Sequence, residues 1–102
     1  MDQAAVLFDK KQDLLTVYPV GRLDSETSPK LLRQLEPEME GIEHVIIDFT
    51  QVDYISSGGM RMLLTVAQAV DVKGGTVKLN HVNEYIREIF EMIGLAGMIQ
   101  AE

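Results

Sequence analysis

The stretch from Asp53 to Arg61 constrains the fold most, because two serines and two glycines stand where an apolar strand turns into a helix. The preceding run, residues 44–49, is continuously apolar and β-branched at its centre, which predicts a strand covered on both faces. After the stretch, apolar residues recur at helical spacing as far as Val70. The two hydroxyls therefore lie at a helix N-terminus, where free N–H groups and the helix dipole favour added negative charge. Such a turn suits a phosphate group or a docked partner.

Length and charge limit what this turn can serve. With 102 residues and 46% hydrophobic content, the chain suffices for one domain, residues 1–102, with its own core. The net charge of −7 disfavours both nucleic acid and an anionic membrane surface as partners. The sequence contains no cysteine, no signal-peptide pattern and no apolar run as long as a membrane span. We therefore expect a cytoplasmic domain without direct membrane contact.

Further strands are predicted on either side of the central one. Short apolar or alternating runs occupy residues 6–8, 14–20, 76–79 and 98–100. Pro19 cannot donate to a ladder, so the end of the second run is expected at an edge or a bulge. Residues 21–24 then leave the sheet.

Three helices are predicted from their apolar stripes and from the residues at their ends. The first is expected to begin with Ser28 as N-cap and to end or kink near Glu36, because Pro37 follows. The second runs from about residue 57 to 73, and the third from a cap at Asn83 to a stop at Gly94. This order predicts an α/β domain, bordering on α+β. We expect a mixed sheet of four to five strands, with about three helices mostly on one face.

Two groups of residues near the turn have more than one interpretation. Asp24 and Thr27, in the loop before the first helix, are expected to face solvent, and either ordinary loop hydrogen bonds or a binding role explains them. The apolar arc of the second helix is unusually wide, because it includes Met62, Val66 and Ala69. Either a neighbouring helix covers these three residues, or they form a partner-binding surface that begins at the serines.

The turn lacks the residues that an enzyme would need. A serine hydrolase needs a base near its nucleophile, but His44 and His81 are predicted at the mouth of a strand and in a loop. Ile55 stands where a nucleophile elbow has its first glycine, and no Lys-Ser or Lys-Thr pair follows as in a phosphate-binding P-loop. The separated histidines and scattered carboxylates predict no metal-ligand cluster. We therefore expect no enzymatic activity, no cofactor and no metal.

The turn and its surroundings resemble the signature of STAS domains, in particular the anti-sigma factor antagonists of bacteria. The resemblance covers nearly the whole chain and is carried by residues 21–24, 27, 45–49, 52, 54–60, 74–75 and 89–95. The chain departs from the common pattern at two positions: Ser56 stands where many members have aspartate, and Gly58 where many have serine, threonine or alanine.

The resemblance implies a regulatory switch. Such a protein binds an anti-sigma factor serine kinase and so frees a sigma factor, until phosphorylation by that kinase ends the interaction and a PP2C-type phosphatase restores it. The phosphorylated position corresponds to Ser57. The implied partner-binding residues are Asp24, Thr27, Ser56, Ser57, Gly58, Gly59, Met60, Arg61 and Met62. The protein itself is expected to be a monomer or a weak dimer.

Two other functions remain open from the sequence. The domain can be a STAS scaffold that is never phosphorylated, or a module that binds a nucleotide or another anion at the helix N-terminus. A hydroxyl at Ser57 favours the switch only modestly, because serine is also a good helix cap.

Overall fold

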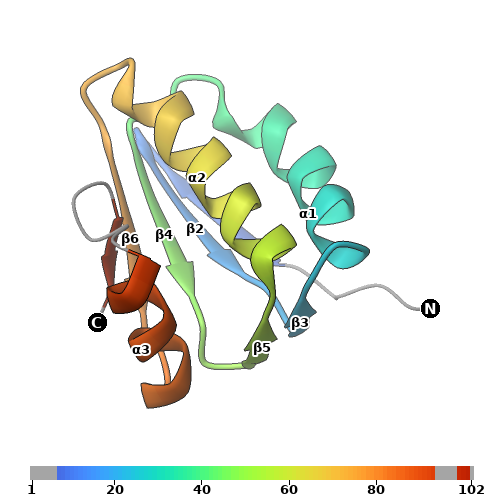
Figure 1. Ribbon diagram of the computed structural model, residues 1–102. Helices are drawn as coiled ribbons and strands as arrows, with labels where there is room; N and C mark the ends of the chain where they lie inside the picture. Colours follow the sequence, from blue (N-terminus) through green and yellow to red (C-terminus); the bar gives the residue numbers. More distant parts are fainter. Residues whose placement is uncertain (1–6, 94–98, 102) are drawn as a thin grey trace.

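The computed structural model describes residues 7–93 and 99–101, which form a mixed sheet with its helices in front of it (Figure 1). The helices α1 and α2 lie side by side, and α3 lies in front of β6. In chain order the elements are β1 Leu7–Lys11, β2 Leu14–Tyr18, β3 Gly21–Leu23, α1 Thr27–Leu35, the 3-10 helix η1 Glu36–Met39, β4 His44–Asp48, β5 Val52–Ile55, α2 Ser57–Asp71, β6 Thr76–Asn80, α3 Glu84–Ile93 and β7 Ile99–Ala101.

The main sheet has five strands in the order β1-β2-β4-β6-β7. Only the β1–β2 pair is antiparallel, and the other neighbours are parallel. The predicted mixed sheet with helices mostly on one face is therefore confirmed. A second sheet was not predicted: β3 and β5 pair in parallel beyond the end of the main sheet. The strand that turns into the serine helix is thus β5, and the long apolar run is the separate strand β4.

The central strand β4 is covered on one face only, so the prediction of two covered faces is wrong. Val45 and Ile47 are buried, whereas Ile46 between them is half-buried. The reason is that the helices lie on a single side of the sheet. A β-branched residue such as Ile46 remains at the surface because apolar atoms form a large part of any protein surface.

Most helix boundaries follow the predicted signals. Pro37 lies in η1, where the regular helix has already ended at Leu35. Asn83 caps α3, because its Oδ1 accepts the Ile86 N–H at 2.8 Å. The helix α2 ends at Asp71, two residues earlier than predicted, and Gly74 follows with φ +79°. The predicted stop at residue 94 and the outer ends of the first and last predicted strands, residues 6 and 98, lie outside the described residues.

The core lies between the sheet and the helices. Leu63 of α2 and Phe90 of α3 belong to it together with the buried side chains of β2, β4 and β6. The two alternatives for the wide arc of α2 have different outcomes for different residues. Met62 and Val66 are buried, and α1 packs against α2, whereas Ala69 is exposed. Within residues 7–93 and 99–101, no helix has both the length and the hydropathy that a membrane crossing requires.

Candidate functional site

The adjacent serines at the start of α2 have different roles. Ser56 is the N-cap: its backbone is extended, and its Oγ accepts the Gly58 N–H at 3.2 Å. Its own N–H donates to the Leu23 carbonyl of β3 at 2.9 Å. Ser57 is the first helical residue, it is exposed, and its hydroxyl has no hydrogen-bond partner in the described part of the chain. The structure therefore confirms that Ser56 is extended and Ser57 begins the helix, and it leaves only the Ser57 hydroxyl free.

Gly58 and Gly59 allow two backbone segments to approach the start of α2. A Cβ atom on Gly59 would lie 2.5 Å from the Leu23 oxygen and 2.7 Å from Ile55 Cγ1. A Cβ atom on Gly58 would lie 2.8 Å from Ser25 Cα. Atoms cannot approach so closely without moving, so both glycines serve packing within the chain. As a result, the loop that contains Asp24 and Ser25 lies directly against the serine turn.

Asp24 is at the surface, as expected, but it is only partly exposed because its side chain also holds the start of α1. Its Oδ1 accepts the N–H groups of Glu26 and Thr27, both at 2.9 Å, and its side chain is 22% exposed. In return, Thr27 Oγ1 accepts the Asp24 N–H at 3.0 Å and donates to the Arg22 carbonyl at 2.7 Å. The hydrogen bond from the Thr27 N–H, then that from Glu26, lowers the pKa of Asp24 from 3.8 to about 2. Loop hydrogen bonding therefore accounts for both residues.

The predicted cap of α1, Ser28, is wrong. The helix begins at Thr27, two residues before the predicted first helical residue, Pro29, because Asp24 reaches forward to satisfy its first N–H groups. Ser28 is then inside the first turn, only 2% exposed, and its Oγ has no hydrogen-bond partner among the described residues. A buried hydroxyl without a partner is uncommon and destabilising.

Two residues beside the turn were missed by sequence reasoning. The Arg22 guanidinium lies 4.2 Å from the centroid of the Tyr54 ring, and its Nε is 3.3 Å from Asp24 Oδ2. Arg22 and Tyr54 face each other across the β3–β5 pair. No local sequence signal could have joined them, because the pairing of these two short strands was itself not predicted.

The remaining predicted contact residues are divided between the core and the surface. Met60 and Met62 are buried, at 7% and 4% exposure, so they have little surface to offer a partner in this conformation. Arg61 is exposed. Between the starts of α1 and α2 is a hollow of about 200 Å³, lined by Ser25, Ser28, Pro29, Leu32, Gly58, Arg61, Met62 and Thr65.

Comparison with known proteins assigns the family. The STAS domain family profile matches residues 5–102. The chain belongs to the STAS domain family. BtrV of Bordetella bronchiseptica, described as a candidate anti-sigma factor antagonist, is 31% identical to this STAS domain over 91 residues, 88% of this chain and 78% of the relative. The anti-sigma-B factor antagonist of Bacillus subtilis is 28% identical over 85 residues, 83% of this chain and 78% of that protein.

Solved structures share the fold of this STAS domain. The anti-sigma factor antagonist SpoIIAA in its unphosphorylated form has a TM-score of 0.77 at 13% identity, over 96% of this chain and 87% of SpoIIAA. The phosphorylated form has a TM-score of 0.75 at 15% identity, over 96% and 91% of the two chains. At these identities the likeness concerns the fold alone.

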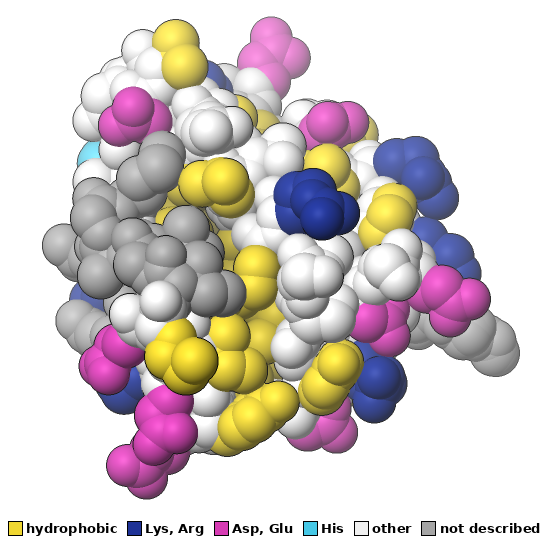
Figure 2. Space-filling model, viewed as in Figure 1, with side chains coloured by type: hydrophobic (Ala, Val, Ile, Leu, Met, Phe, Trp, Pro, Cys, Tyr) yellow, Lys and Arg dark blue, Asp and Glu magenta, His cyan; other side chains and the backbone are white. Residues whose placement is uncertain are grey.

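The face that carries α2 and α3 has a large apolar area. Figure 2 shows hydrophobic side chains gathered between these two helices on the lower half of the face. On α3, Tyr85 and Met92 are strongly exposed. Contiguous exposed apolar surface of this kind is typical of interaction sites.

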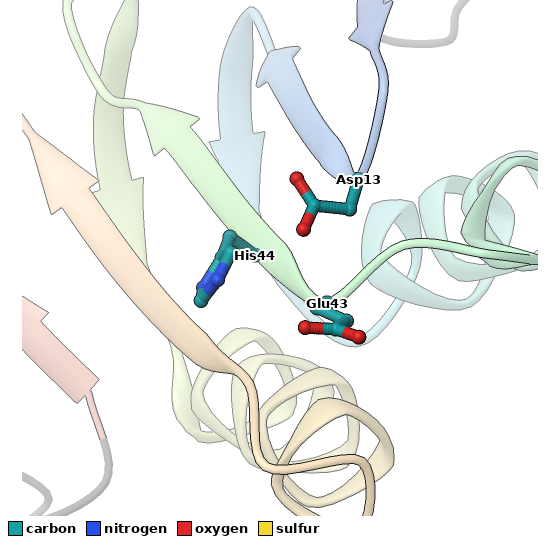
Figure 3. Close-up of side chains that lie close together, drawn as sticks. All are labelled: Asp13, Glu43 and His44. Atoms are coloured by element: carbon teal, nitrogen blue, oxygen red, sulfur yellow. The ribbon is translucent and has the colours of Figure 1, made fainter.

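A second group of polar side chains lies at the other end of the sheet, at the start of β4. One ligand atom each from Asp13, Glu43 and His44 lies within 4.8 Å of the other two (Figure 3). The prediction that histidines and carboxylates form no cluster is therefore wrong. The cause is the parallel register of β2 and β4, which pairs Leu14 with His44 and so brings the preceding residues, Asp13 and Glu43, together.

Proposed function

We propose that this STAS domain is an anti-sigma factor antagonist that binds an anti-sigma factor serine kinase and is released by phosphorylation of Ser57. The observation that carries the proposal is the free, exposed hydroxyl of Ser57, the first residue of α2. The neighbouring hydroxyl of Ser56 is occupied as the helix cap. The names of the relatives from Bordetella and Bacillus support the class of protein.

A phosphate at this position would act on binding more than on folding. Phosphoserine carries a charge of about −1.5 to −2 at neutral pH, which the positive end of a helix dipole tolerates. In a docked interface, the same charge must lose its water or face acidic groups of the partner. A ~100-fold loss of affinity corresponds to about 2.7 kcal/mol, which one buried charge can supply.

The proposed contact surface follows from exposure around the turn. It comprises the exposed Ser57 and Arg61 on α2 and, beside them, the partly exposed Asp24 and Thr27 at the start of α1. The apolar area between α2 and α3 lies on the same face as α2 (Figure 2). In this proposal the domain is a regulatory cytoplasmic protein without enzymatic activity, a monomer or weak dimer, with a PP2C-type phosphatase as its second partner.

The deciding experiment combines the protein with its cognate kinase and ATP. We expect one phosphate per chain, located on Ser57 by fragment-ion mass spectrometry. Ser57→Ala should abolish the modification and still bind the kinase, while Ser57→Glu should bind it more weakly. Ser56→Ala is the matched control and should still be phosphorylated. A phosphate on Ser56, or none with an active kinase, would contradict the proposal.

Substitution of Arg61 tests binding to the kinase without changing the phosphorylated residue. Its side chain is exposed and makes no hydrogen bond or ion pair within residues 7–93 and 99–101, so Arg61→Ala should leave the free protein intact. We expect a weaker complex with the kinase in a calorimetric titration. Unchanged affinity would remove this part of α2 from the contact surface.

The hollow beside α2 bears on the alternative of a small-ligand module. Its volume of about 200 Å³ is below the range of about 300–1,000 Å³ that is usual for ligand pockets. A titration of the purified protein with nucleotides should therefore show no saturable binding. A STAS scaffold without a switch would be indicated if Ser57→Ala and Ser57→Glu bound the kinase equally.

A further inference from the structure

The group formed by Asp13, Glu43 and His44 is held in place by the backbone. The N–H groups of Glu43 and His44 both donate to the Asp13 carbonyl, at 2.9 and 3.0 Å. The Glu43 carbonyl in turn accepts the Thr76 N–H at 3.0 Å. Three segments, the β1–β2 turn, the start of β4 and the start of β6, are therefore joined at one point (Figure 3). The three side chains therefore extend from backbone segments that are hydrogen-bonded to one another.

The imidazole of His44 is oriented by a second hydrogen bond. Its Nδ1 lies 3.0 Å from Thr76 Oγ1 on β6. In metal sites, a ligating histidine almost always has its other ring nitrogen hydrogen-bonded, and the bond of Nδ1 to Thr76 gives His44 this arrangement with Nε2 as the ligand. The half-buried ring thus has the support that a metal ligand needs, while the two carboxylates are exposed and adjustable.

We infer that Asp13, Glu43 and His44 form a binding site for a divalent transition-metal ion, with Zn²⁺ as the best match. One imidazole nitrogen and two carboxylate oxygens are ligands that Zn²⁺ accepts, whereas Mg²⁺ and Ca²⁺ bind oxygen ligands. Two carboxylates and a neutral imidazole also balance the charge of the ion. Water molecules complete the coordination, as in other zinc sites with three protein ligands.

The ligand atoms of the three side chains can surround a zinc ion if the side chains move slightly closer together. Ligand atoms around a tetrahedral zinc ion are about 3.3 Å apart, given bonds of about 2.0–2.1 Å. The present separations, up to 4.8 Å, require the exposed carboxylates to move inward by rotation of their side chains. The net charge of −7 further favours the approach of a cation.

The inferred ion would cross-link segments that are distant in the sequence. It would tie the β1–β2 turn to the start of β4, at the end of the main sheet away from the serine turn. An ion that binds only the folded protein raises its stability in proportion to the logarithm of the ion concentration. The inference does not depend on the function proposed for Ser57.

The test is a calorimetric titration of the tag-free protein with ZnCl₂ in a buffer that does not bind metal. We expect saturable binding of one zinc ion per chain, no comparable signal with MgCl₂, and a melting temperature that rises with zinc concentration. His44→Asn should abolish the saturable binding and the thermal shift. Glu43→Gln and Asp13→Asn should weaken binding, and Thr76→Val should lower the affinity by about 10–100-fold through the loss of ring orientation.

His81→Asn is the matched control, because the chain has two histidines and both lie near a carboxylate. His81 Nδ1 is 3.8 Å from Asp48 Oδ2 at the opposite end of β4, and asparagine tolerates the positive φ of this position. This variant should bind zinc like the wild type. The inference is overturned if zinc does not bind with a stoichiometry of one, if His44→Asn binds as tightly as the wild type, or if both histidine variants lose binding equally. Circular dichroism of each variant checks that it has folded.

Discussion

The two helices that meet at the serine turn begin in different ways. At α2 the cap is the residue immediately before the helix, Ser56, whose Oγ accepts the Gly58 N–H. At α1 the residue before the helix, Glu26, makes no side-chain cap bond, and Asp24, three residues before the helix begins, accepts the N–H groups instead; the predicted cap, Ser28, is buried. The comparison shows why Ser57 is available: its neighbour has already taken the capping role. It also shows that a residue type suited to capping does not fix where a helix begins.

Truncating a core side chain of α2 is expected to have the largest effect on the stability of the fold. Leu63 is fully buried between α2 and the sheet, so Leu63→Ala should lower the free energy of unfolding by about 2–5 kcal/mol. The adjacent Leu64 is only half-buried, and Leu64→Ala should cost clearly less. Urea denaturation of both variants measures the difference. Equal midpoints for Leu63→Ala and the wild type would mean that α2 is not anchored through this face.

The two glycines of the turn should differ in the same experiment. A Cβ atom on Gly59 would meet the carbonyl of a paired strand, so Gly59→Ala should cost about 1–3 kcal/mol. A Cβ atom on Gly58 would lie 2.8 Å from Ser25 Cα, a wider approach than the 2.5 Å at Gly59, so Gly58→Ala should cost less. The reverse order would show that the loop before α1, and not β3, sets the position of α2.

Removing each serine hydroxyl separates the cap from the free position. Ser56→Ala should lower stability by about 1 kcal/mol, because the Gly58 N–H loses its acceptor. Ser57→Ala should stay within about 0.5 kcal/mol of the wild type, as is usual for exposed positions. Thermal unfolding of the two variants under one condition is sufficient. Similar losses for both would contradict the division of roles at the start of α2.

The smallest effect on stability is expected for substitution of Asp24 at the start of α1, and this effect depends on pH. Hydrogen bonds to the Asp24 carboxylate lower its pKa from 3.8 to about 2, so the folded state favours the charged form. The resulting stabilisation is complete above the ordinary value of 3.8 and is lost as the pH falls from there to about 2. In Asp24→Asn this contribution is absent at every pH. The stability difference between wild type and variant should therefore shrink as the pH falls below 3.8 and through about 2, and a difference at pH 2 as large as that at neutral pH would argue against the assignment.

Sequence reasoning succeeded where the determining contacts are local. The Asn83 cap, the end of α1 before Pro37 and the distinction between Ser56 and Ser57 all depend on neighbours within a few residues. These signals act through backbone geometry that each residue imposes on its own turn. The family resemblance added the proposal that Ser57 is the phosphorylated residue.

What the sequence did not reveal depends on contacts between distant segments. The periodicity of a strand reports which side chains share a face, but it does not report the register against a parallel neighbour. For this reason the pairing of Arg22 with Tyr54 was missed, and so was the meeting of Asp13 with Glu43 and His44.

The parallel pairing of β2 with β4 also has a consequence for the order in which the chain folds. The β1–β2 hairpin closes a turn of two residues, since Lys11 pairs with Leu14. In contrast, Leu14 pairs with His44, so all of β3, α1 and η1 must be enclosed before the centre of the sheet can form. Closing a long loop costs more entropy than closing a short one, and non-local pairing slows folding. The hairpin is therefore expected to form early, and the junction of Asp13 with the start of β4 late, so that a bond made there acts mainly by slowing unfolding.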